Sequence, residues 1–217
     1  MAKVQGVKEK LHWPLYDAFV VPPQNGDLTA VPTFGSEMAK RDPRMIRFFV
    51  DVQNKTKLET NLQSAGVLPS LNTFEARALR VIFSPVIHER QKEKPPTTHS
   101  LLTDDIMADL IYNSVTSLLV GEKVMIEMPT YYFPSGAGVS PGNQTVSSHG
   151  IADPMATFRF SEPVTIEPNQ NFRVEMLFPQ GVPASVTSPE KATRLADAKG
   201  PLRLWVVLDG YLTRDVQ

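Results

Sequence analysis

The sequence contains no cysteine, carries almost no net charge and has no long apolar run, and each absence excludes a class of protein. Without cysteine, its 217 residues provide no disulfide, no thiolate zinc site and no cysteine nucleophile. Its 22 basic and 23 acidic residues give a formal net charge of −1, without any block of like charge. Because phosphate neutralisation needs clustered lysine and arginine, we expect no sequence-specific nucleic-acid partner.

Membrane and export signals are missing from the sequence as well. No apolar run reaches the roughly 18 residues of a membrane-spanning helix, so we expect no membrane span. The first 30 residues lack an apolar core followed by a small-residue cleavage site, which predicts no secretion signal. Glycine is sparse with 12 residues, whereas proline is abundant with 19. This balance predicts many stiff connections rather than a flexible linker.

No motif for catalysis, a metal or a cofactor stands out. The four histidines are not spaced as His-x-His or His-Glu-x-x-His, and no phosphate-binding glycine loop is present. The densest carboxylate cluster is Asp104, Asp105 and Asp109, where a helix start explains the first two better than chemistry does. We therefore expect no enzyme, no catalytic residue, no cofactor and no metal, while a site assembled from distant residues stays open.

Short segments with alternating apolar and polar residues recur along the chain. Alternation places one set of side chains on a core and the other in solvent, as in a half-buried strand. The predicted strands are residues 47–52, 74–83, 115–120, 123–128, 158–160, 172–176 and 202–208. Because the last of these ends as a continuous apolar run, we expect Trp205 to be buried, which requires cover on the second face of its sheet.

The segments between these strands have their own patterns. Thr103 followed by two aspartates predicts a short helix near 103–112, and Ser188-Pro189 predicts another around 190–198. Residues 167–171 have the composition of a hairpin loop. Residues 134–150 form the longest loop candidate, and residues 89–100 a further exposed loop.

The N-terminal 45 residues combine prolines with aromatic and β-branched residues. The prolines argue against a long helix or a central strand, and the apolar content argues against disorder. We interpret residues 1–45 as an extended arm and residues 46–217 as a single β-sandwich domain, so that removing residues 1–40 would leave the domain folded. Aromatic residues often dominate interfaces; the candidate interface residues are Trp13, Tyr16, Phe19, Phe34, Tyr131, Tyr132 and Phe133.

The pattern of strands resembles a known family. Residues 158–176, a strand, a turn and a second strand, resemble the corresponding part of the single jelly-roll capsid proteins of tailless icosahedral viruses. Residues 202–211 are similar to the closing strand of these proteins, and the resemblance spans roughly residues 46–212. It implies an all-β, antiparallel sandwich of jelly-roll type, with one or two short helices in loops and an extended N-terminal arm. Many capsid proteins carry a strongly basic arm, which this sequence lacks.

Two functions follow as hypotheses. The first is a structural, self-assembling subunit of a viral or virus-like shell. It would be found in the virion after synthesis in the host cytoplasm, with other copies of itself and other shell proteins as partners. The alternative is a carbohydrate- or receptor-binding β-sandwich module of a larger particle, which would use the 134–150 loop and Tyr131–Phe133.

Overall fold

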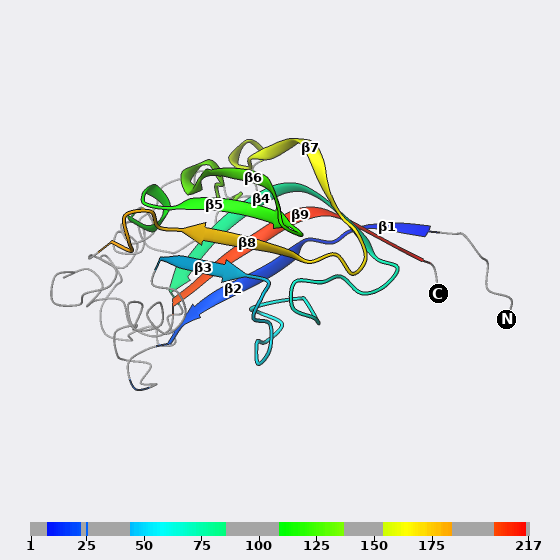
Figure 1. Ribbon diagram of the computed structural model, residues 1–217, viewed down its shortest axis with the longest axis horizontal. Coiled ribbons are helices and arrows are strands. Elements are labelled where there is room, and N and C mark those ends of the chain that lie inside the picture. The colour runs from blue at the N-terminus through cyan, green and yellow to red at the C-terminus, as the bar shows by residue number, and fades with distance from the viewer. Residues whose placement is uncertain are drawn as a thin grey trace, which may run out of the picture.

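The computed structural model describes residues 8–22, 25, 44–85, 109–136, 154–183 and 202–215. These residues are mostly in β-strands, which form two antiparallel sheets packed as a sandwich (Figure 1). The all-β, antiparallel sandwich predicted from the alternating segments is therefore confirmed.

The larger sheet has five strands and the smaller has four. The larger sheet contains β1 (Lys8–His12), β2 (Leu15–Val21), β9 (Leu202–Asp215), β4 (Thr73–Pro85) and β7 (Arg159–Ile166). The smaller sheet runs in the order β3 (Met45–Phe48), β8 (Phe172–Leu177), β5 (Val115–Val120) and β6 (Lys123–Pro129). Two 3-10 turns, η2 (Thr130–Tyr132) and η3 (Pro154–Ala156), and helical residues 109–112 complete the described elements.

The strand pairs are nested in the sequence. The innermost pair, β5 with β6, is joined by the tight turn at Gly121, whose φ of +60° suits glycine. Around it β4 pairs with β7, β3 with β8, and β2 with β9, all antiparallel. The pairings of β4 with β9 and of β5 with β8 then join these pairs into the two sheets. The chain is therefore folded like one long β-hairpin, whose N-terminal and C-terminal halves pair with each other and are wound together into the two sheets.

The core lies between the sheets and is made by the inward side of each strand. On β9 the even-numbered apolar residues from Leu202 to Leu208 and Leu212 all belong to it, as strict alternation requires. Six phenylalanines are almost completely buried, which gives the sandwich its main apolar volume: Phe48, Phe49, Phe74, Phe133, Phe172 and Phe178.

A bulge in β4 changes which of its side chains face the core. Phe74 and Ala76 face inward before the bulge, whereas Leu79 faces inward after it, because one extra residue is inserted between Ala76 and Ala78. Gly210 lies opposite the bulge, where a Cβ atom would come within 2.1 Å of the Glu75 carbonyl oxygen. The close approach of the two backbones therefore requires glycine at this position.

Residues 49–62, which we call the closing loop, cover the open side of the sandwich at β2. Asn61 accepts a hydrogen bond from the Tyr16 backbone N–H and donates one to the Pro14 carbonyl oxygen, at 3.0 and 2.7 Å. A β-bridge joins Asp17 to Thr60. Backbone groups that the edge strand would otherwise leave unpaired are thus satisfied within the chain.

The predicted arm is wrong for residues 8–21, which are strands β1 and β2 of the larger sheet. The prolines that argued against strands lie beside them: Pro14 separates β1 from β2, and Pro22 follows β2. The remaining arm residues before β3 are outside the described part of the chain, apart from Pro22, Asn25 and Arg44.

The structure describes all of one further predicted connection and part of another. Residues 167–171 do not form a hairpin loop, because β7 pairs in the larger sheet and β8 in the smaller, so this turn crosses between the sheets. The helix predicted near 103–112 is helical at 109–112, the part that is described. The segments 89–100, 137–150 and 190–198 lie outside the described residues.

Candidate functional site

The structure separates the seven candidate interface residues into buried and exposed groups. Phe19 and Phe133 are 3% and 1% exposed and belong to the core, so their assignment to an interface is wrong. Phe34 lies outside the described residues. Tyr16 is partly buried under the closing loop, where its hydroxyl donates to the Lys57 carbonyl oxygen. Trp13 is exposed on the turn between β1 and β2.

The two remaining candidates, Tyr131 and Tyr132, join a third tyrosine on the surface. Tyr112, Tyr131 and Tyr132, which we call the tyrosine stack, are 72%, 49% and 47% exposed. The ring centroids of Tyr112 and Tyr131 are 5.9 Å apart, those of Tyr131 and Tyr132 are 4.9 Å apart, and both pairs are inclined by 30°. Rings at these distances attract each other, so the stack presents a continuous aromatic surface.

Buried hydroxyl groups hold the segments that carry the tyrosine stack. The Thr130 hydroxyl, directly before Tyr131, lies 2.7 Å from that of Ser114 and 2.8 Å from that of Thr116. Ser114 also donates to the Leu110 carbonyl oxygen, which ties the helical turn carrying Tyr112 to the same cluster. Because unpaired buried hydroxyls are costly, this network fixes the helical turn against η2.

The tyrosine stack is also connected to the core. Tyr132 meets Phe158 edge to face, with centroids 6.3 Å apart, and Phe158 meets the buried Phe133 in the same way at 5.7 Å. The tyrosine stack is therefore connected to the buried Phe133 through Phe158.

Sequence reasoning found Tyr131 and Tyr132 but missed Tyr112 and Phe158. Nothing in the spacing of these residues brings them together, because they come from the segments before β5, after β6 and before β7. The available signal was the predicted helix near 103–112, which ends at Tyr112 and leads directly into a predicted strand.

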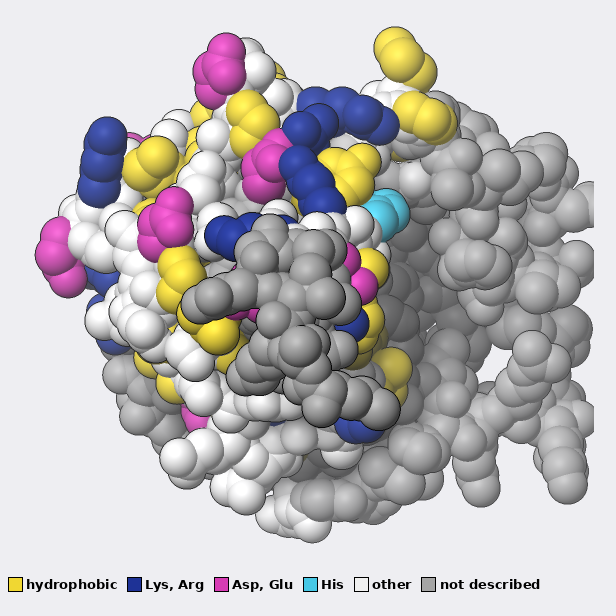
Figure 2. Space-filling model, turned by 90° about the vertical axis from the view of Figure 1, so that its right-hand side faces the viewer, with side chains coloured by type: hydrophobic (Ala, Val, Ile, Leu, Met, Phe, Trp, Pro, Cys, Tyr) yellow, Lys and Arg dark blue, Asp and Glu magenta, His cyan; other side chains and the backbone are white. Residues whose placement is uncertain are grey.

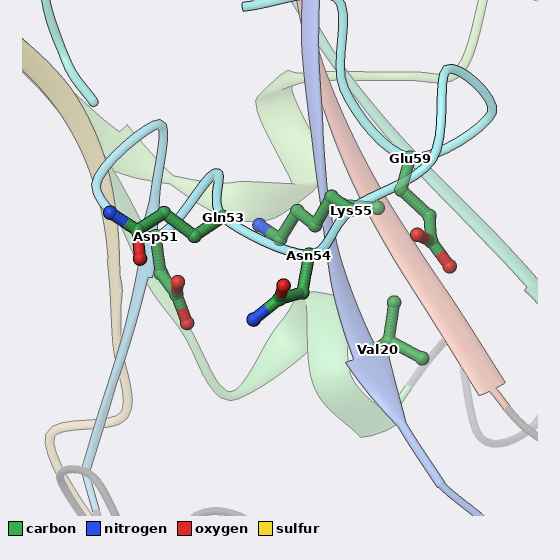
Figure 3. A pocket seen from close by; sticks show the side chains of 7 residues that line it. Val20, Asp51, Gln53, Asn54, Lys55 and Glu59 are labelled. Carbon is green, nitrogen blue, oxygen red and sulfur yellow. The ribbon is translucent and has the colours of Figure 1, made fainter. Parts of the chain in front are cut away.

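A second feature is a shallow hollow of about 240 Å³ between β2 and the closing loop. Figure 3 shows Asp51, Gln53, Asn54 and Lys55 projecting from the loop near Val20 of β2. Its lining combines apolar atoms from the strand with amide and charged groups from the loop: Ala18, Val20, Asp51, Gln53, Asn54, Lys55 and Glu59.

A buried ion pair lies beside this hollow. Asp17 is fully buried, and its carboxylate accepts hydrogen bonds from Lys55 Nζ at 2.9 and 3.0 Å and from the Phe49 backbone N–H at 2.7 Å. Burial raises the pKa of Asp17 above its usual value, and the charge of Lys55 opposes this rise only in part. The pair anchors the closing loop to the inner face of β2, so its role is structural.

The end of the molecule with β1 carries charges of both signs. Figure 2 views this end and shows Lys and Arg side chains interspersed with Asp and Glu. The Tyr211 ring lies 5.0 Å from Lys10 Nζ and 5.1 Å from the Arg77 guanidinium, and both cations pair with Glu75. These two cations lower the pKa of the Glu75 carboxyl. Lys10 and Arg77 are therefore held in a local cluster with Glu75 and Tyr211.

No protein-family model and no curated protein matches this chain. Function therefore has to be inferred from the fold and the surfaces described above. Within the described residues, no group of three or more His, Asp or Glu side chains is arranged to hold a metal ion. The helical segments of this part of the chain are all too short or too polar to cross a membrane.

Proposed function

We propose that this chain is a jelly-roll protein that serves as a structural, self-assembling subunit of a viral or virus-like shell, without a catalytic role. The observation that carries the proposal is the nested pairing of the strands. A jelly roll has eight strands in two facing sheets, wound as Greek keys. In this protein β2–β9–β4–β7 faces β3–β8–β5–β6, and β1 extends the edge beside β2.

Jelly rolls occur in viral shells, in lectins and in the cupin enzymes, so the fold alone leaves several functions open. A cupin would need clustered histidines with a downstream glutamate, and the four histidines of the sequence are spread from position 12 to position 149. Of the remaining classes we favour the shell subunit because of the resemblance of residues 158–176 and 202–211 to capsid proteins.

The connections of the sandwich also favour a subunit that meets neighbours at one end. In the larger sheet β2 and β4 end side by side, since Val21 and Pro85 both pair with Leu202. In the smaller sheet β6 and β8 end side by side, since Val115 pairs with both Leu177 and Pro129. Figure 1 shows the ends of β2, β4 and β8 at the same end of the sandwich. The opposite end has the two-residue turn between β5 and β6, the turn between β7 and β8, and the connection between β3 and β4, whose closing loop packs against β2. Long connections grouped on a rigid scaffold are where binding functions usually concentrate. The proposed partners are other copies of this chain and other shell proteins, within a virion.

The test is assembly of the purified full-length chain. Light scattering and negative-stain electron microscopy over a range of protein concentrations and ionic strengths should show closed particles of uniform size. A monodisperse monomer under all of these conditions would contradict the proposal.

The tyrosine stack favours a second candidate, a carbohydrate-binding module. Sugar rings commonly stack on exposed aromatic side chains, and lectins are among the proteins that use the jelly roll. In this case, binding to a glycan panel would be lost in Tyr131→Ala and retained in Trp13→Ala, which removes an aromatic residue of similar exposure elsewhere. The absence of any glycan that distinguishes the two variants would exclude this candidate.

A further inference from the structure

The edges of the two sheets differ in how well they are protected against pairing with another chain. An edge strand presents unpaired backbone groups, and proteins usually cover, shorten or interrupt it. On the larger sheet, the closing loop covers β2, β1 has only five residues, and β7 is interrupted by Pro163. On the smaller sheet, β3 has only four residues.

β6 is the longest of these edges that is neither covered by the closing loop nor interrupted by an internal proline. It has seven residues, its only proline is the last one, and within the described part of the chain it pairs only with β5. Val124 and Met125, the second and third residues of β6, are 47% and 37% exposed. An exposed apolar edge of this kind suits pairing with another strand.

The sequence of β6 is complementary to itself in the antiparallel direction. If two copies of Lys123–Glu127 are placed antiparallel with Met125 opposite Met125, Lys123 of each copy lies opposite Glu127 of the other. Val124 then lies opposite Ile126. Oppositely charged residues across a strand pair attract each other, whereas like charges in the same place repel. Both Lys123 and Glu127 are exposed, and one carboxylate oxygen of Glu127 accepts a hydrogen bond from the Ser117 hydroxyl at 3.1 Å.

We propose that β6 pairs antiparallel with β6 of a second copy of this chain, about a two-fold axis at Met125. The smaller sheets of the two copies would then join into one continuous sheet. The axis is placed at Met125 because this register sets Lys123 opposite Glu127, and the bulge between Leu118 and Leu119 leaves Met125 without a partner on β5. This inference rests on the proposed function in that it supplies a two-fold contact of the shell, although the dimer can be measured without the shell.

The contact is small, because a strand of seven residues is roughly 24 Å long. A single edge contact of this size gives a weak dimer, whereas many such contacts add up in a closed assembly. The dimer is therefore best detected by covalent trapping, which captures a weak but specific contact.

The absence of cysteine makes trapping direct. In Met125→Cys the new thiol is the only one in the chain, and across the proposed axis it lies opposite its counterpart, within reach of a disulfide. The matched control is Leu177→Cys, on β8 of the same sheet, because Leu177 is also 37% exposed. In dilute solution with a mild oxidant, Met125→Cys should form the disulfide dimer at least about tenfold faster than the control.

Charge reversal then tests the register. In the Met125→Cys background, Glu127→Lys places lysine opposite lysine, and Lys123→Glu places glutamate opposite glutamate. Each should slow trapping about tenfold. Combining the two substitutions restores opposite charges and should restore the rate. Glu127→Gln, which can keep the hydrogen bond from Ser117, should have an intermediate effect.

The outcomes separate this inference from the proposed function. Equal trapping of Met125→Cys and Leu177→Cys, or no effect of the charge reversals, would overturn the β6 contact even if particles form. Faster trapping of Met125→Cys than of the control, slowed by each charge reversal and restored by the double reversal, would establish the β6 contact even if no particles form. In that case only the proposed shell function would be rejected.

Discussion

Replacing Lys55 with methionine should destabilise the protein, because it leaves the Asp17 carboxylate buried without its cation. Asp17 is fully buried, and its carboxylate accepts two hydrogen bonds from Lys55 Nζ beside the one from the Phe49 backbone N–H. Methionine is unbranched and of similar length to lysine, so loss of packing is kept small.

The expected cost is about 3 kcal/mol in the free energy of unfolding at pH 7. Removing one partner of a buried pair typically costs about 3–5 kcal/mol. The lower end applies because the Lys55 side chain is 13% exposed, so water can approach the carboxylate when the lysine is gone. For a chain of this size the loss corresponds to a decrease in Tm of roughly 6–12 °C.

The cost should decrease on acidification. The pKa of Asp17 is raised in the folded state, so the stability linked to this group is fully present below its unfolded pKa and is lost as the pH rises through the folded pKa. Lys55 lowers the pKa of Asp17, and its removal raises that pKa further. The difference between wild type and Lys55→Met is therefore small where the carboxyl group is protonated in both proteins, and it grows as the pH rises.

The measurement is urea unfolding of wild type, Lys55→Met, Asp17→Leu and the double variant over a series of pH values. The double variant should recover part of the loss, because it removes both charges and leaves an apolar pair. Arg214→Ala is the control, since Arg214 pairs with Glu9 at the surface and should cost at most about 1 kcal/mol. A pH-independent cost of Lys55→Met, or no coupling between the two substitutions, would refute the reasoning.

Three further predictions concern the fold. Gly210→Ala should lower the free energy of unfolding in urea by about 2–3 kcal/mol, because the new Cβ would meet the Glu75 backbone. Gly121→Ala should lower it by only about 1 kcal/mol, because Gly121 has open space around it and a φ of +60°. Trp205→Phe should cost about 1 kcal/mol, because the indole loses its 3.0 Å hydrogen bond to a carbonyl oxygen of the closing loop, and an unchanged stability would show that the loop does not hold this ring. Deleting residues 1–21 should abolish the β signal in circular dichroism, because it removes β1 and β2 with their core residues, and a folded truncated protein would contradict their place in the sheet.

The strands of the domain from β3 onward could be predicted because burial on one face imposes a two-residue period. All seven predicted segments overlap a strand of the structure, and β9 shows why: its inward residues alternate without interruption from Leu202 to Leu208. The prediction failed for β2. Its outward-facing Ala18 is fully buried, so apolar and polar residues do not alternate regularly along this strand. Trp205 is partly buried on the outer face of its sheet, rather than in the core, with the closing loop as its cover.

Of the candidate interface, sequence reasoning identified aromatic residues but could not separate those in the core from those on the surface. Phe133 and Tyr132 are neighbours in the chain, yet one is 1% and the other 47% exposed, because η2 turns their side chains in different directions. Tyr112 could not be added to Tyr131 and Tyr132, since its place depends on the buried contacts of Ser114 and Thr130.

By itself the sequence determined that this is a β protein without disulfides, because composition and a two-residue period act locally along each strand. It did not determine which strands are neighbours, because pairing partners lie far apart in the chain and are selected by the fit of the whole core. The nested pairing, the burial of Asp17 beside Lys55 and the exposed edge of β6 all depend on that selection, so only the tertiary structure decided them.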